Sequence, residues 1–253
     1  MALLEAHNLT KHFGGLAAVH RVDLTVHDGE IVGLIGPNGA GKTTCFNLLS
    51  GFLPPTDGTI TFAGAPTLGL KPYEMVARGL VRTFQQTTLF QEMTVLQNVL
   101  MGLHQHSRRG LGRVLASWRA FPPDEMARCH EVLAFTGLTA MSEQLAKSLP
   151  HGHQRTLGIA MALAVRPRLL MLDEPVTGMN LDESLRVMQL VKTIRDRGTT
   201  ILLVEHNMRA VMGTCERILV LNFGQKLAEG TPAEVASNPD VIAAYLGPGV
   251  SHA

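Results

Sequence analysis

The sequence lacks several features that mark specialised classes of protein. Its only cysteines, Cys45, Cys129 and Cys215, are an odd number without a CxxC pair, which argues against a disulfide framework or a zinc site. No stretch approaches the roughly 20 apolar residues that span a bilayer. The first ten residues also lack the apolar core of a signal peptide. We therefore expect a reducing compartment, and action at a membrane only by docking onto another protein.

The chain also lacks a strong net charge. Its 22 basic and 21 acidic residues leave +1 at pH 7, so no overall field attracts nucleic acid or anionic lipid. Any phosphate must be held locally. At 253 residues and 45% hydrophobic content, the chain can fold into an α/β domain with a smaller subdomain.

Three short apolar runs, residues 31–35, 169–172 and 201–204, predict buried strands. A helix is predicted between the second and third by apolar residues at helical spacing, Leu185, Met188, Val191 and Ile194, with Gly198 closing it. Such a βαβ unit makes its strands parallel. Because ligands bind beyond the carboxyl ends of parallel strands, we expect the polar residues that follow the three runs to gather at one sheet edge.

The first of these runs leads into a phosphate-binding pattern. Residues 36–43 read Gly-Pro-Asn-Gly-Ala-Gly-Lys-Thr, which matches GxxxxGK[ST] between a predicted strand and a predicted helix. In this pattern backbone N–H groups and the helix N-terminus hold the β-phosphate of ATP, the lysine reaches the β and γ oxygens, and the threonine hydroxyl coordinates Mg²⁺. The alternative is a glycine-rich turn with a chance lysine. The predicted nucleotide-binding residues are Gly36, Pro37, Asn38, Gly39, Ala40, Gly41, Lys42, Thr43 and Thr44.

Acidic and histidine side chains follow the other two runs. Asp173 is predicted to hold Mg²⁺, and Glu174 to orient and partly deprotonate the attacking water. His206 follows the third run and is predicted to bond the γ-phosphate. Taken alone, the acidic pair could be a helix cap or loop, and the histidine a structural or surface residue.

In this order, the elements resemble the ATPase subunit of an ABC transporter over nearly the whole chain. The resemblance implies that Phe13 stacks on adenine and that Gln85, in Arg-Thr-Phe-Gln, is the glutamine-loop residue acting in catalysis and at the metal. Gln86 is an adjacent alternative. The resemblance also places the signature at 149–154, where Leu149 and Gly152 would contact nucleotide. It places the Walker B segment at 169–174, the D-loop at 177–180 and the switch histidine at His206.

The implied fold is an α/β P-loop NTPase core with a mainly parallel sheet, an N-terminal antiparallel β region and an inserted α-helical subdomain. We expect core segments at 1–86 and 155–230, the helical subdomain at 87–154, and a helical tail at 231–253. Within the insertion, residues 108–119 carry Arg108, Arg109, Arg113 and Arg119 beside an apolar stripe. This stretch is either a satellite helix or a contact for a partner or lipid headgroups.

Members of this family bind Mg-ATP in head-to-tail dimers and drive transmembrane permease subunits served by a solute-binding protein. The resemblance thus implies a second ABC ATPase subunit, a peripheral position on the cytoplasmic face of the cell membrane, and no nucleic acid. Residues 92–99, 103–123 and 230–247 are similar to the branched-chain amino acid uptake branch. Related importers of urea, amides or other solutes remain alternatives, and the tail also reads as a capped amphipathic helix.

The signature departs from the family pattern. Pro150 stands where the consensus has serine, and His151 and His153 replace a glycine and a glutamine. Proline offers neither a hydroxyl nor an N–H. Losing such contacts, at about 1.5–3 kcal/mol each, would weaken ATP-driven closure roughly ten- to a hundredfold. Asn180 in place of the D-loop aspartate and Met161 in place of an arginine are further departures.

These departures predict that a heterodimer with a sister ATPase hydrolyses ATP faster than the homodimer. They also leave an ATP-binding module with little turnover as an alternative. A third class, a soluble ABC ATPase acting on nucleic acid or ribosomes, is disfavoured by the near-neutral charge and the single P-loop.

Overall fold

The structure is a computed structural model that describes residues 1–83, 89–104 and 121–246. The chain divides into two compact units. The first contains Met1–Arg82 and Arg168–Ala253, and the second contains Thr83–Pro167. The chain therefore leaves the first unit after Arg82 and returns to it at Arg168.

An antiparallel sheet opens the first unit. Its described strands are β1 (Ala2–Phe13), β2 (Leu16–His27), β4 (Asp57–Phe62) and β5 (Ala65–Pro66), in the order β2-β1-β4-β5. Gly58 has φ +95°, and a Cβ there would lie 2.6 Å from the carbonyl oxygen of Asn8, so the pairing of β1 and β4 requires glycine at this point. This sheet confirms the antiparallel region expected at the N-terminus.

The second sheet of this unit is mainly parallel. Its described strands are β3 (Ile31–Ile35), β6 (Leu80–Arg82), β7 (Leu169–Asp173), β8 (Thr200–Val204), β9 (Arg217–Asn222) and β10 (Gln225–Gly230), in the order β10-β9-β3-β8-β7-β6. Only β10 among these described strands pairs antiparallel. Every residue of β3, β7 and β8 is buried, as expected for central strands covered on both faces. All three predicted strands are confirmed.

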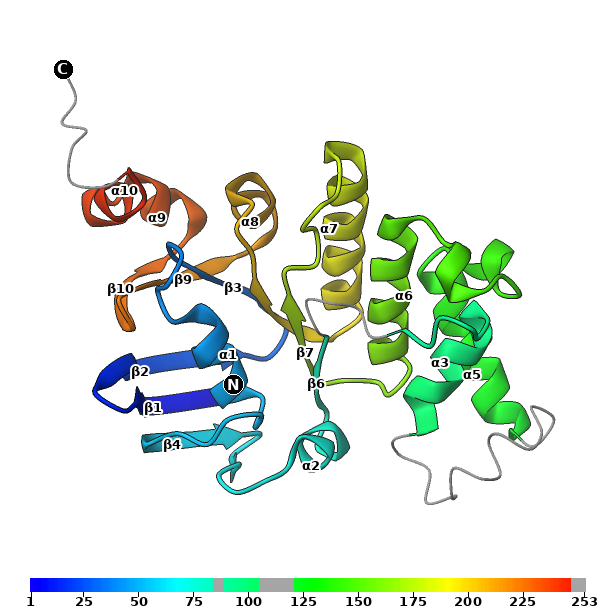
Figure 1. The fold of residues 1–253 in the computed structure, drawn as a ribbon, viewed down its shortest axis with the longest axis horizontal. Helices are drawn as coiled ribbons and strands as arrows, with labels where there is room; N and C mark the ends of the chain where they lie inside the picture. Colours follow the sequence, from blue (N-terminus) through cyan, green and yellow to red (C-terminus); the bar gives the residue numbers. More distant parts are fainter. Residues whose placement is uncertain (84–88, 105–120, 247–253) are drawn as a thin grey trace. The chain divides into compact units, whose positions relative to one another are not determined.

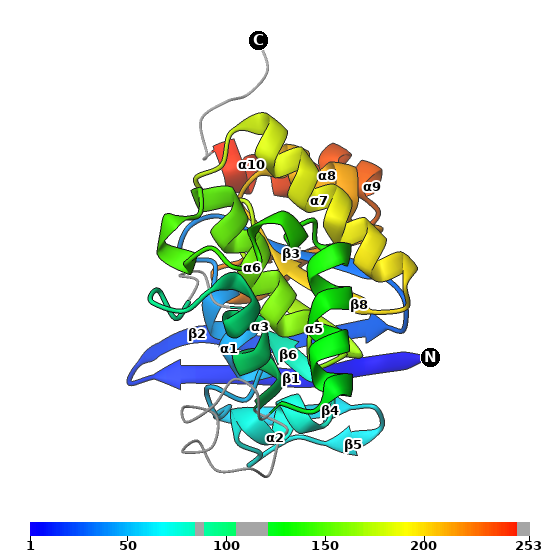
Figure 2. The same cartoon turned by 90° about the vertical axis from the view of Figure 1, so that its right-hand side faces the viewer.

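Helices cover both faces of the parallel sheet, as Figures 1 and 2 show. Helix α1 (Lys42–Leu49) lies between the two sheets, and its Phe46 and Leu49 join a core to which both sheets contribute. The opposite face carries α7 (Leu181–Asp196), α8 (Met208–Thr214), α9 (Pro232–Ser237) and α10 (Pro239–Leu246). The short helix α2 (Pro72–Ala77) precedes β6.

The predicted helix between β7 and β8 is confirmed as α7, although not all of the apolar residues that indicated it are buried. Leu185 is 56% exposed, whereas Val187, Met188, Val191 and Ile194 are buried. Asn180 caps this helix: its side chain accepts a hydrogen bond from the Glu183 N–H at 2.9 Å, and Glu183 accepts one from the Asn180 N–H at 3.1 Å. The unusual D-loop residue therefore has a structural role as an N-cap.

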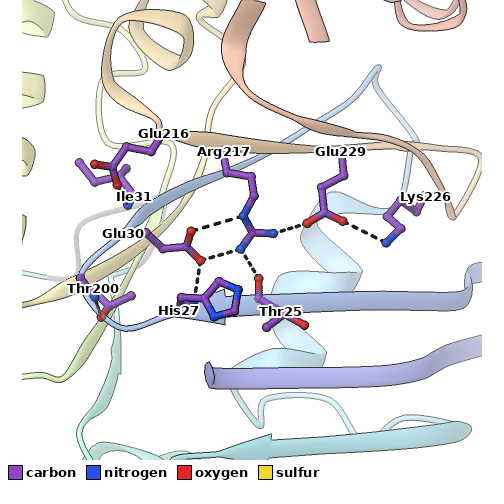
Figure 3. A network of polar contacts seen from close by, with 10 residues as sticks. Thr25, His27, Glu30, Ile31, Thr200, Glu216, Arg217, Lys226 and Glu229 are labelled. Carbon is purple, nitrogen blue, oxygen red and sulfur yellow. Dashed lines mark hydrogen bonds and ion pairs between the residues drawn. The ribbon is translucent and has the colours of Figure 1, made fainter. Parts of the chain in front are cut away.

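A partly buried ionic network joins the two sheets (Figure 3). Arg217 of β9 pairs with Glu30, just before β3, at 2.6 Å and with Glu229 of β10. The same guanidinium donates to the carbonyl oxygen of Thr25 in β2. Arg217 thus connects the parallel sheet to an edge of the antiparallel one.

The second unit is helical in the part of it that the structure describes. It contains α3 (Val95–His104), α5 (Pro123–Phe135), α6 (His151–Leu163) and the short 3₁₀ turns η2 (Thr139–Met141) and η3 (Ala146–Ser148), around a core of its own. Gly102 of α3 approaches α6 so closely that a Cβ there would lie 2.6 Å from the Met161 carbonyl oxygen. The unit spans 83–167, a wider range than the 87–154 expected for the helical subdomain.

The basic stretch at 108–119 lies outside the described residues. In the described part of the chain, no helix combines the length and apolar character needed to cross a membrane. All three cysteines are buried and free, and burial raises the pKa of each thiol to about 12.

Candidate nucleotide-binding site

The loop from Gly36 to Gly41 joins the end of β3 to the start of α1, the context that the phosphate-binding pattern requires. Gly36, Gly39 and Gly41 have φ values of +151°, +81° and +95°, in a region that residues with a Cβ rarely adopt. The N-cap of α1 is Gly41, which has no side chain to cap the first N–H groups of the helix. The first helical turn also carries no acidic residue. The N-terminus of α1 is therefore suited to an anion.

Lys42 is folded over this loop. Its Nζ donates to the carbonyl oxygens of Gly36 at 2.6 Å and Pro37 at 2.9 Å, and the residue is only 6% exposed. Burial lowers the pKa of Lys42, while the negative charge of Glu174 opposes this shift and raises it. A phosphate at the loop would give the buried ammonium a stronger partner than two neutral carbonyls.

Residues from the C-terminal part of the chain hold the phosphate-binding loop at both ends. At the first end, the hydroxyl of Tyr245 in α10 lies near the Gly36 N–H, so that burial raises the pKa of the tyrosine while this N–H lowers it, and a Cβ on Gly36 would lie 2.1 Å from the Leu221 carbonyl oxygen. At the other end, the Gly224 N–H donates to the Ala40 carbonyl oxygen at 3.0 Å. The β9–β10 turn and α10 therefore constrain the shape of the loop.

Glu174 follows β7 in a strained backbone conformation. Its φ is +48°, and its N–H donates to the Val204 carbonyl oxygen of β8 at 2.9 Å. A left-handed conformation at a residue with a Cβ costs about 1–2 kcal/mol. Such strain is commonly found where a side chain must point in a particular direction for function.

The Glu174 carboxylate is held by two partners at the sheet edge. Its Oε1 lies 2.6 Å from Nε2 of His206, which follows β8, and its Oε2 accepts a hydrogen bond from the Thr177 hydroxyl at 3.0 Å. The carboxylate side chain is 11% exposed, whereas the histidine side chain is 44% exposed. The contact between Glu174 and His206 confirms that polar residues from separate strand ends gather at one edge.

Asp173 ends β7 and is also buried, at 6% exposure. Its Oδ2 pairs with the Arg82 guanidinium at 2.7 Å. The neighbouring strand end carries Glu205, 1% exposed, whose carboxylate accepts backbone N–H groups of Val176, His206 and Asn207 at 2.9, 3.0 and 3.2 Å. Burial raises the pKa of Glu205, although these hydrogen bonds oppose the shift.

The donor set suits magnesium. Asp173 contributes carboxylate oxygens at the end of β7, and Thr43, an exposed residue in the first turn of α1, contributes a hydroxyl. These are hard oxygen ligands, the type that Mg²⁺ prefers, and Mg²⁺ is usually held by only one or two protein ligands plus phosphates and water.

The remaining predicted residues lie in different places. Phe13 ends β1, is 49% exposed as a residue, and has Lys11 Nζ 5.5 Å from its ring centroid. Gln85 and Gln86 lie outside the described residues. In the second unit, Leu149 and Gly152 are buried at the start of α6, and Pro150 is the N-cap of that helix.

The fold and the site have close counterparts among known proteins. Residues 19–177 match the ABC transporter family. This chain belongs to the ABC transporter family. It is an ATP-binding ATPase cassette, and residues 225–247 also match a family described as branched-chain amino acid ATP-binding cassette transporter.

Individual relatives cover nearly the whole cassette. The high-affinity branched-chain amino acid transport ATP-binding protein LivG of Salmonella typhimurium is 46% identical over 97% of this chain and 98% of its own. BraF of Pseudomonas aeruginosa, with the same description, is 43% identical over the same shares. A crystal structure of an ABC transporter cassette in its ADP conformation has a TM-score of 0.89 at 30% identity, covering 98% of this chain and 99% of that one. A dimeric, post-hydrolysis cassette with ADP and Pi has a TM-score of 0.77 at 27% identity, covering 91% of this chain and 99% of that one.

Sequence reasoning assigned no role to three residues of this region. In the sequence, Arg82 belongs to the Arg-Thr-Phe-Gln segment, Glu205 is a polar residue that follows a predicted strand, and Tyr245 belongs to the C-terminal tail. The signal for Glu205 was its position directly before His206 at a strand end. No local pattern indicated that Arg82 meets Asp173 or that Tyr245 meets Gly36.

Proposed function

We propose that this cassette is the ATP-hydrolysing subunit of an importer for branched-chain amino acids. The observation that carries the hydrolytic part is the Glu174 carboxylate, held by His206 and Thr177 and electrostatically coupled to Lys42 of the phosphate-binding loop. The solute class is supported by LivG and BraF, which match nearly the full chain, and by the C-terminal match at 225–247.

In this proposal the loop and the α1 N-terminus bind the β- and γ-phosphates, and Lys42 turns from its carbonyl partners to the phosphate oxygens. The adenine ring stacks on Phe13, whose ring is accessible at the end of β1. Thr43 and Asp173 would hold Mg²⁺, with Gln85 as a further ligand. When bound, Mg²⁺ neutralises charge on the phosphates that develops during transfer.

Glu174 acts as the base that orients water for attack on the γ-phosphate, a contribution of about 10²–10⁴ in rate. The Glu174–His206 contact leaves the histidine side chain 44% exposed, so it can bond the γ-phosphate when nucleotide is bound.

A working dimer is part of the proposal, with Leu149 and Gly152 of one subunit facing the nucleotide of the other. The dimeric cassette with ADP and Pi supports this arrangement. The cassette would sit on permease subunits at the cytoplasmic face of the membrane, with a solute-binding protein delivering the amino acid.

Transport by reconstituted vesicles tests the proposal. The cassette, its permease subunits and the binding protein are placed in proteoliposomes containing Mg-ATP, and uptake of labelled leucine is compared with that of labelled urea. We expect leucine uptake that disappears with Lys42→Ala and with Glu174→Gln. Uptake of urea alone would refute the amino acid assignment.

A second function, ATP binding with little turnover, is favoured by Pro150 at the N-cap of α6, because proline supplies neither a hydroxyl nor an N–H there. ATPase rates of wild type and Glu174→Gln separate the two functions. Equal rates with ATP binding retained would support the binding module. Hydrolysis that is faster in a heterodimer with a sister ATPase than in the homodimer would show that a partner's signature compensates for Pro150.

A further inference from the structure

Arg82 joins the end of one strand to the end of its neighbour. It is the last residue of β6, and Nη2 of its guanidinium lies 2.7 Å from Oδ2 of Asp173, the last residue of β7. Both side chains are only 7% exposed. The ion pair is therefore shielded from solvent, and the position of the guanidinium affects how the carboxylate is oriented.

The guanidinium is fixed by further contacts with helix α1 and the residues just after it. Nη1 donates to Oδ1 of Asn47 at 2.5 Å and to the hydroxyl of Ser50 at 3.1 Å. The guanidinium carbon also lies 4.8 Å from the ring centroid of Phe46 and 5.4 Å from that of Phe52. These oxygen acceptors and aromatic rings hold Arg82 in one place, since each adds a directional or stacking constraint.

Only arginine can make this set of contacts from one position. Its planar guanidinium presents several N–H donors in a rigid arrangement, so it can serve Asp173 on one side and Asn47 and Ser50 on the other. A lysine ammonium is a compact charge on a flexible stem and lacks the flat face that stacks on aromatic rings. A change to lysine would keep the charge and lose the geometry.

We propose that Arg82 is a positioning residue for the magnesium site: it fixes the Asp173 carboxylate relative to α1, the helix that carries Thr43. This inference rests on the proposed function, in which Asp173 and Thr43 hold Mg²⁺. Residues that hydrogen-bond to metal ligands orient those ligands, and changing them typically weakens metal binding by about 10–100-fold. Arg82 is also the last residue before the chain enters the second unit, so the same side chain anchors the start of that connection.

The test measures metal binding without requiring turnover. Mn²⁺ serves as the probe because its binding to the ADP complex is detected by electron paramagnetic resonance. Arg82→Lys and Arg82→Met are compared with wild type, and Arg78→Lys is the matched control, since Arg78 makes an exposed hydrogen bond to the Pro66 carbonyl oxygen in the same region. ADP affinity without metal is measured in parallel.

We expect Mn²⁺ affinity to fall about 10–100-fold in both Arg82 variants, while metal-free ADP affinity and the Arg78→Lys variant stay within twofold of wild type. Mn²⁺ affinity within twofold of wild type in a folded Arg82→Lys would overturn the inference, and this variant decides the matter if Arg82→Met does not fold. A wild-type protein that binds neither ADP nor Mn²⁺ would instead refute the proposed function.

Discussion

Removing one oxygen atom from the C-terminal helix should weaken nucleotide binding. The Tyr245 hydroxyl lies near the N–H of Gly36, the first residue of the phosphate-binding loop, so that burial raises the pKa of the tyrosine while this N–H lowers it. Tyr245→Phe keeps the ring and deletes only this hydroxyl. The buried Gly36 N–H then loses this polar neighbour at a position where the Leu221 carbonyl leaves little room for adjustment, because a Cβ on Gly36 would lie 2.1 Å from that oxygen.

The size of the effect follows from burial. A buried N–H left without a partner costs about 1–3 kcal/mol. Tyr245 is 40% exposed, so water can partly replace the hydroxyl, and we expect a cost of about 1 kcal/mol. If ADP binding requires the wild-type shape of the loop, this cost is subtracted from the binding free energy, and the Kd for ADP should rise roughly fivefold.

Calorimetric titration of ADP into wild type, Tyr245→Phe and Tyr73→Phe provides the assay. Tyr73 is the other tyrosine of this chain, lies in α2 and is 62% exposed, so its change to phenylalanine should leave the Kd unaltered. Equal Kd values for the two variants would show that the Tyr245 hydroxyl does not support the loop. A lower melting temperature with an unchanged Kd would also refute the reasoning, since it would assign the hydroxyl to stability alone.

Three further outcomes are expected. Gly36→Ala should abolish ADP binding in a titration or prevent folding, whereas Gly64→Ala, also at a positive φ but with no atom within 4 Å of the added Cβ, should bind ADP normally; normal binding by Gly36→Ala would contradict the steric argument. Arg217→Met should lower the free energy of unfolding in urea by about 2 kcal/mol with little dependence on salt, because the ion pairs it breaks are partly buried; a loss that vanishes in high salt would indicate an exposed pair. Burial raises the pKa of Glu205 in the folded state above its ordinary value in the unfolded chain. The carboxyl group therefore contributes its whole stabilisation at pH values below the ordinary pKa, and this contribution is lost as pH rises from the ordinary pKa through the raised one. Unfolding free energies of wild type minus Glu205→Gln should therefore decline with pH over this window, and a flat difference would contradict the assignment.

Much of the fold could be predicted because it depends on patterns among residues that are close together in the sequence. The buried strands at 31–35, 169–172 and 201–204 appear as continuous apolar runs, and the phosphate-binding loop appears as glycines and a lysine at set spacing. Such a strand can be predicted without knowing which strands lie beside it, because both faces of a central parallel strand are covered and nearly all of its residues are therefore apolar. Membership of the family follows from the order of such patterns.

Prediction was less successful where a residue's environment depends on distant parts of the chain. Leu185 fits the helical spacing but lies at the edge of the buried stripe of α7, and so it is exposed. Asn180 was a departure from a motif, and the structure makes it the N-cap of that helix.

The sequence alone determined the family, the strands and the loop that can bind phosphate, since each depends on residues adjacent in the chain. Only the tertiary structure decided that Arg82 meets Asp173, 91 residues later, and that Tyr245 meets Gly36. The reason is that a side chain's partner depends on which strands and helices become neighbours in space. A single sequence records the residue types in such a contact but not the contact itself.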